Sequence, residues 1–177
     1  MSETIVISEA LYPSRLHERL GAEAPGALFA IGQVNLLSLS TTALFCSARC
    51  PGSAILRAYD QAAHRRDTGR CIISGFHSPV EQECLRILLR GTSPVIICPA
   101  RSLPKRIPPK WQAPLAEGRM LILSMFPSGE SRITSALAAR RNEFVAALAD
   151  DVWFAHIEEG GHTEKLAQQI ALWNHSP

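Results

Sequence analysis

The sequence of 177 residues contains no run of about 20 uninterrupted apolar residues, the length that a helix needs to cross a membrane. Residues 1–16 also lack the basic segment and the apolar stretch of a signal peptide. Aromatic residues make up only 6% of the chain, and lysine supplies just 3 of its 18 basic residues. We therefore expect a cytoplasmic protein with no membrane partner, in which arginine dominates the basic surface.

Cysteine occurs in no recognisable pattern. The five cysteines form neither a CxxC pair nor the even set of a disulfide framework. Cys46, Cys71 and Cys98 lie inside apolar runs, where a thiol behaves as a small hydrophobic group. The Cys and His spacings match no standard zinc-ligand pattern. We expect no metal and no cofactor.

The short catalytic motifs GxSxG, HExxH, GxGxxG and the P-loop are absent as well. One pair remains for acid–base chemistry, His77 and Glu81, which lie one helical turn apart. The alternative reading is structural: Ser78-Pro79-Val80-Glu81 has the pattern of a capping box at a helix start. Whether the protein is an enzyme is left uncertain, and the sequence argues more against it than for it.

What the chain does contain is an alternation of strands and helices. With 46% hydrophobic and 19% charged residues, it has the composition of a globular protein, and its length suits one domain, residues 1–177. Residues 1–26 are expected to form a lead-in segment with a short helix near Ser14–Leu20. The apolar runs that predict strands are Ala27–Ile31, Ala43–Cys46, Cys71–Ser74, Val95–Cys98, Met120–Leu123 and Val152–Ile157. The segments with helical spacing are Ile55–Arg65, Val80–Leu89, Thr134–Leu148 and Thr163–Leu172. This order predicts an α/β fold, a mostly parallel sheet with helices on both faces.

One segment interrupts the alternation. Residues 99–114 contain five prolines and four basic side chains, and this proline density predicts an extended surface loop without a helix.

The expected binding site follows from the sheet. Ligands of parallel sheets bind beyond the carboxyl ends of the strands, where helix amino termini attract anions. The candidate phosphate-binding residues are those in the loops at this edge, together with a polar pair on the helix of residues 134–148: Ser47, Arg49, Ser74, Gly75, His77, Ser78, Arg101, Arg141, Asn142, Gly160, Gly161, His162 and Thr163. For each loop a plain alternative stays open, in which the glycines only permit turns and the arginines are only solvated.

Several of these segments resemble one known family in the same order along the chain. The matching segments are Tyr12-Pro13, Leu28-Phe29 with Gly32, Ala48-Arg49, Ser74-Gly75, Glu117-Gly118 through Ser124 and Pro127, the run from Arg141 to Val152, and Gly160-Gly161-His162-Thr163. Together they are similar to the DNA-processing protein A (DprA, or Smf) family, from about residue 12 onward. The chain departs from the family where Cys46-Ser47-Ala48 replaces a glycine-containing turn and where residues 76–81 replace an arginine-containing segment.

The resemblance implies a three-layer Rossmann-like fold of the SLOG/LOG superfamily and binding of single-stranded DNA or a nucleotide, within DNA processing or uptake. In that family the DNA is passed to a recombinase. The alternative is a LOG-like nucleotide phosphoribohydrolase, which would cleave an N-glycosidic bond, or a protein that binds or senses a small nucleotide. A homodimer is a further possibility.

Overall fold

The computed structural model describes residues 4–173. The strands are β1 (Ile5–Val6), β2 (Phe29–Gly32), β3 (Thr41–Cys46), β4 (Cys71–Ser74), β5 (Val95–Ile97), β6 (Met120–Ser124) and β7 (Asp151–His156). The α-helices are α1 (Arg15–Leu20), α2 (Gly52–Asp67), α3 (Pro79–Leu89), α4 (Pro109–Ala116), α5 (Ser135–Leu148) and α6 (His162–Trp173). Short 3-10 helices are η1 (Glu9–Leu11), η2 (Gly21–Glu23) and η3 (Val34–Ser38).

The strands form one sheet in the order β1-β2-β6-β5-β4-β3-β7. The five strands from β3 to β7 pair in parallel, as the alternation with helices predicted. β2 pairs antiparallel with both β6 and β1. The expectation of a mostly parallel sheet is confirmed, and its antiparallel part is confined to the β1 edge.

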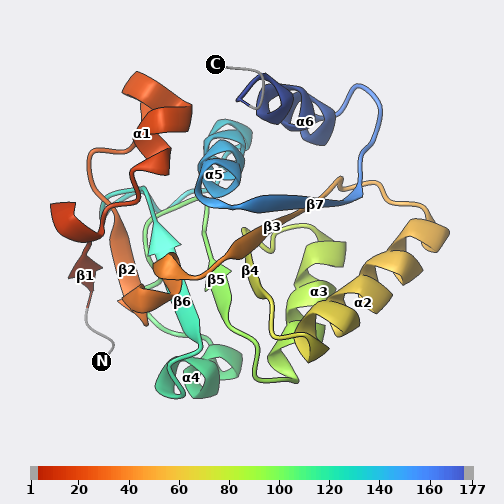
Figure 1. Cartoon of the computed structure of the whole chain (residues 1–177), viewed down its shortest axis with the longest axis horizontal. Coiled ribbons are helices and arrows are strands. Elements are labelled where there is room, and N and C mark those ends of the chain that lie inside the picture. Colours follow the sequence, from red (N-terminus) through yellow and green to blue (C-terminus); the bar gives the residue numbers. More distant parts are fainter. Residues whose placement is uncertain (1–3, 174–177) are drawn as a thin grey trace.

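Helices cover both faces of this sheet, so the three-layer arrangement is confirmed (Figure 1). Alternate side chains of each central strand enter two separate cores. In β3, for example, Ala43 and Phe45 face the core beneath α1, α5 and α6, whereas Leu44 and Cys46 face the core beneath α2, α3 and α4. Such alternation is expected of strands that are buried on both faces. No helix within residues 4–173 is both long and apolar enough to span a bilayer.

The capping box predicted at the start of α3 is present. The Ser78 hydroxyl accepts a hydrogen bond from the Glu81 backbone amide, while the Glu81 carboxylate accepts one from the Ser78 amide. A cap that the sequence analysis did not single out starts α5, where the Thr134 hydroxyl accepts a hydrogen bond from the Leu137 amide. In the lead-in segment, the short helix expected near Ser14–Leu20 is α1.

The prediction that residues 99–114 form a loop throughout is wrong for their second half, where α4 begins. Pro109 occupies the first helical turn, where a missing N–H costs nothing. Pro114 lies inside the helix but is buried, and Trp111 and Leu115 pack on the core beneath it. Tertiary packing therefore outweighs the local penalty of proline at this position.

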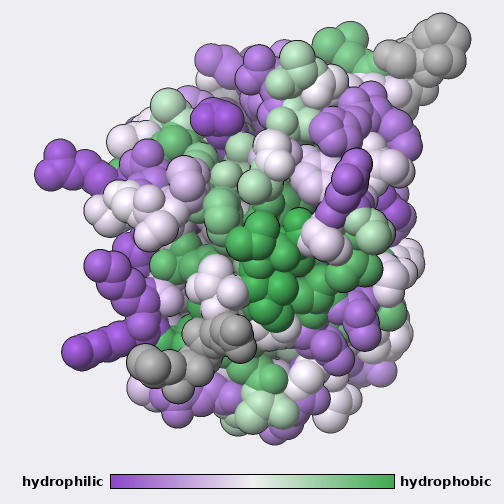
Figure 2. All heavy atoms as spheres, turned by 90° about the vertical axis from the view of Figure 1, so that its left-hand side faces the viewer, coloured by the Kyte–Doolittle hydropathy of each residue, from purple (hydrophilic) through white to green (hydrophobic). Residues whose placement is uncertain are grey.

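The β1 edge carries the most apolar part of the surface seen from that side. Figure 2 shows hydrophobic side chains gathered there, and the exposed hydrophobic residues in this part of the chain are Ile5, Val6, Leu11 and Leu39. β1 itself was not predicted from the sequence, because two residues are too few to show a pattern. This edge is remote in the strand order from β3, β4 and β7, whose carboxyl ends border the cavity described next.

Candidate functional site

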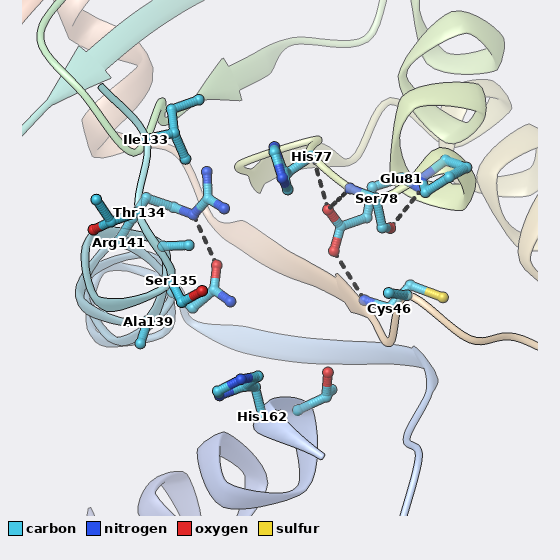
Figure 3. A pocket seen from close by; sticks show the side chains of 15 residues that line it. Cys46, His77, Ser78, Glu81, Ile133, Thr134, Ser135, Ala139, Arg141 and His162 are labelled. Atoms are coloured by element: carbon cyan, nitrogen blue, oxygen red, sulfur yellow. Dashed lines mark hydrogen bonds between the residues drawn. The ribbon is translucent and has the colours of Figure 1, made fainter. Parts of the chain in front are cut away.

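A cavity of about 540 Å³ opens at the carboxyl ends of the parallel strands. Four parts of the chain form its walls: the end of β3, the first turn of α3, the start of α6, and one side of α5 with the residues before it. Figure 3 shows the α5 side chains on one wall, those at the start of α3 on the opposite wall with Cys46 below them, and His162 at the bottom of the view. We call this space the site cavity. It lies where the parallel-sheet rule places a ligand.

Arg141 of α5 forms the most constrained part of the wall. Its side chain is only 4% exposed, and no other arginine within residues 4–173 is buried. The Nη1 group donates a 2.8 Å hydrogen bond to the Cys98 carbonyl, and Nε donates one of 2.7 Å to Oδ1 of Asn142. Burial lowers the pKa of Arg141, while the nearby Glu81 carboxylate acts in the opposite direction. An arginine remains charged under these conditions, so a positive charge is held at the cavity wall.

Gly75 is the reason that Arg141 can lie there. A Cβ atom at Gly75 would stand 1.9 Å from Nη1 of Arg141 and 2.0 Å from its Cζ. The guanidinium therefore lies directly on the glycine backbone, in space that any other residue would fill. The sequence predicted a role for Gly75 in contact with a ligand, whereas in the structure its missing side chain makes room for an arginine.

Glu81 holds the opposite wall together. Its Oε1 accepts a 2.9 Å hydrogen bond from the Cys46 amide, and its Oε2 accepts bonds of 2.8 and 3.1 Å from the amides of His77 and Ser78. The carboxylate is 7% exposed. It thus occupies the amides that a phosphate would otherwise use at the start of α3. Both oxygens are engaged, which fits the capping interpretation better than a base paired with His77.

The start of α6 is different, because the backbone amides of its first two residues are open, that is, not used in a hydrogen bond within the described chain. The amide of Gly160 donates to the Glu164 carboxylate at 2.8 Å, and that of Gly161 donates to the Glu158 carbonyl at 3.1 Å. The next two amides, of His162 and Thr163, have no hydrogen-bond acceptor within residues 4–173. Both residues line the site cavity. Open amides at a helix start attract anions, so the anion-binding capacity lies just after the glycines.

Six of the thirteen predicted residues line the site cavity. They are His77, Ser78, Arg141, Asn142, His162 and Thr163. Whether they bind a ligand stays a prediction.

The other seven do not line it, and two of them act as internal supports. Ser47 is buried, and its hydroxyl accepts a hydrogen bond from the Glu158 amide. The Ser74 hydroxyl donates to the Leu44 carbonyl and accepts from the Phe76 amide. These serines shape the turns that follow β3 and β4. Gly75, Gly160 and Gly161 have the roles given above.

The two remaining arginines are exposed and do not line the site cavity. The side chain of Arg49 is 88% exposed and lies 3.6 Å from Glu158. Arg101 is exposed in the loop after β5, and its carbonyl accepts a hydrogen bond from the Ser124 hydroxyl. Neither forms part of the wall.

Sequence reasoning missed the apolar part of the wall. On the α5 side, the lining residues that it did not select are Ile133, Thr134, Ser135, Ala138 and Ala139; elsewhere they are Cys46, Ala48, Pro79 and Glu81. A signal was available, because Ser135, Ala138 and Ala139 precede Asn142 by seven, four and three positions and therefore share its side of a helix.

Two kinds of reactive group can be checked at the site cavity, an activated thiol and a metal-binding cluster. Burial and the neighbouring Cys50 raise the pKa of the Cys46 thiol far above its ordinary range, so Cys46 is not an activated nucleophile. Within residues 4–173 no group of three or more His, Cys, Asp or Glu side chains is placed to hold a metal ion. What the cavity offers is a buried cation, two open amides and an apolar side, a combination that suits a phosphate joined to a less polar group.

The fold and this cavity define a Rossmann-like α/β protein with its candidate site at the carboxyl edge of the sheet. The chain belongs to the DNA recombination-mediator protein A family, whose family model matches residues 3–167. This finding confirms the resemblance drawn from the sequence. Among curated proteins no match was found.

Two solved structures share the fold. One is DNA processing protein A from Helicobacter pylori, described for its unique single-stranded DNA binding mode. It matches with a TM-score of 0.78 and 18% sequence identity, and the alignment covers 98% of this chain and 80% of that one. The other is DNA processing protein A (DprA) from Streptococcus pneumoniae, with a TM-score of 0.77 and 19% identity over 98% of this chain. The alignment spans 60% of the pneumococcal chain.

Proposed function

We propose that the protein binds single-stranded DNA in the site cavity, as part of DNA processing. The observation that carries this proposal is that the buried Arg141 guanidinium and the open amides of His162 and Thr163 line one cavity. Membership of the DNA recombination-mediator protein A family, and a fold shared with a protein described for single-stranded DNA binding, support the same ligand.

The physical basis is the match between the wall and a nucleotide. A phosphate group suits Arg141, which can still donate through the part of its guanidinium not bound to Cys98 and Asn142. The dipole of α6 favours the same negative charge. Ile133, Ala138 and Ala139 supply the apolar surface that a sugar and base require.

The alternative of an N-glycosidic hydrolase needs a carboxylate that is free to act on substrate. Among residues 4–173, Glu81 is the only acidic residue that lines the site cavity, and its oxygens accept three backbone hydrogen bonds. Binding is therefore favoured over hydrolysis.

The test is fluorescence anisotropy with a labelled single-stranded oligonucleotide at low and high salt. Asn142→Ala and His162→Ala each remove one wall side chain, whereas Arg140→Ala removes an exposed arginine of the same helix that lies outside the cavity. We expect binding by the wild type, weaker binding by both wall variants, and wild-type affinity for Arg140→Ala apart from a small salt-dependent loss.

Two results would contradict the proposal. One is an absence of DNA binding by the folded wild type. The other is binding that both wall variants leave unchanged. Unlabelled mononucleotides, added as competitors and analysed for released base, test the alternative in the same experiment.

A further inference from the structure

A second cavity, of about 460 Å³, adjoins the site cavity along α3. It lies between the outer side of α3 and the start of α4, and we call it the α3–α4 cavity. Pro79 lines both cavities, so they meet at the first turn of α3. Figure 1 shows α3 and α4 on the same face of the sheet, with α3 running away from the edge where the site cavity opens.

The α3–α4 cavity carries excess positive charge. Arg86 and Arg90, one turn apart on α3, and Lys110 of α4 all line it. Arg86 forms an ion pair with Glu83, the only acidic residue of the lining within the part of the chain that the structure describes. Neither Arg90 nor Lys110 forms an ion pair with any residue in the described range 4–173. Arg90 lies near enough to Glu83 to lower the pKa of that carboxyl, and Nζ of Lys110 lies 6.0 Å from the centre of the Trp111 ring. Three positive side chains therefore face one carboxylate in the described lining, next to the proposed DNA site.

The floor of the same cavity is apolar. Pro79, Leu85 and Leu89 line it beneath the charged side chains. Leu85 is 4% exposed and belongs to the core under α3, so this floor is fixed by the fold. An apolar floor with excess cations suits the sugar–phosphate backbone of a nucleic acid, because phosphates pair with the cations while sugars and bases cover the floor.

We propose that the α3–α4 cavity is a second contact for the strand that occupies the site cavity. A single-stranded oligonucleotide passes from the site cavity over Pro79, and its next phosphates pair with Arg90 and Lys110. This inference rests on the proposed function and makes it more specific. The ligand is an oligonucleotide, because Arg90 lies just beyond the far end of α3, roughly 16 Å along the helix from Pro79, and a mononucleotide in the site cavity is too short to span that distance.

The experiment compares two ligand lengths in one protein. A labelled oligothymidylate of about 16 nucleotides is long enough for both cavities, and a 5′-phosphorylated dinucleotide, measured by competition, reaches only the first. The test variant is Arg90→Ala with Lys110→Ala. The control is Arg57→Ala with Arg140→Ala, which removes the same charge from exposed positions outside both cavities.

The expected size of the effect follows from counterion release. For single strands each phosphate contact contributes about 0.7 to the slope of log affinity against log salt, so the loss of two contacts lowers that slope by about 1.4. At about 0.1 M salt this corresponds to roughly 5-fold per contact and about 25-fold for both. We expect this loss for the long ligand and none for the dinucleotide.

The outcomes separate this inference from the function on which it rests. If the wild type binds the long ligand and the test variant weakens it no more than the control does, the second contact is refuted and the proposed function stands. A variant that weakens both ligands equally also refutes the second contact, because its effect then arises in the site cavity. A wild type that binds neither ligand refutes the proposed function itself.

Discussion

Replacing Gly75 by alanine tests the packing on which the site depends. Gly75 does not have a positive φ, so its backbone accepts alanine without strain. The new Cβ would stand 1.9 Å from Nη1 of Arg141, closer than such atoms approach in proteins. The guanidinium must move, and it then loses its 2.8 Å hydrogen bond to the buried Cys98 carbonyl.

The magnitude follows from that hydrogen bond. A bond from a charged donor contributes about 1.5–3 kcal/mol, and we take about 2 kcal/mol. For a chain of this size the melting temperature then falls by about 4–8 °C, and the protein stays folded at room temperature. If the displaced guanidinium also loses about 2 kcal/mol of DNA binding, the affinity falls about 30-fold.

Thermal unfolding and oligonucleotide anisotropy measure the two effects in one variant. Gly26→Ala is the matched control, because a Cβ at Gly26 meets no atom within 4 Å. Wild-type stability for Gly75→Ala would refute the packing argument. Reduced stability with unchanged DNA affinity would show that the position of Arg141 has no part in binding.

Two further predictions concern stability alone. Gly32→Ala should lower the free energy of unfolding, measured by urea denaturation, by about 3 kcal/mol or more. The reason is that Gly32 has φ +105 and that a Cβ there would lie 2.4 Å from the Met120 carbonyl oxygen. A loss below about 1 kcal/mol would contradict this close approach. Burial raises the pKa of Asp150, but the Thr41 amide and Arg15 outweigh it and hold the pKa below the ordinary 3.8. Since this carboxylate stabilises the fold while ionised, its contribution is lost as pH falls below about 4. Asp150→Asn should therefore show a shallower loss of stability between about pH 4 and 2 than the wild type, and equal slopes would contradict this.

The fold was readable from the sequence because its strands are continuous apolar runs. Cys71–Ser74 was predicted with the bounds that β4 has. The sequence did not reveal α4, because proline is a strong local signal against a helix and the burial of Trp111 and Leu115 is a tertiary effect. It did not reveal that β2 is antiparallel either, since pairing direction depends on which strands become neighbours.

The site was readable only in part. The rule for parallel sheets located the edge where the site cavity opens and brought His162 and Thr163 into the candidate set. The capping box predicted the bond between Glu81 and the Ser78 amide, but the sequence could not show that Glu81 also accepts from the Cys46 amide at the end of β3, because that contact joins distant parts of the chain. The burial of Arg141 is of the same kind, since it depends on a glycine far away in the sequence.

The most direct test of the account is an amide-resolved NMR titration of the protein with a single-stranded oligonucleotide. The account predicts that the amide signals of His162 and Thr163 shift first and furthest, together with that of Asn142. Shifts confined to other surfaces, with these three signals unmoved at saturation, would contradict it.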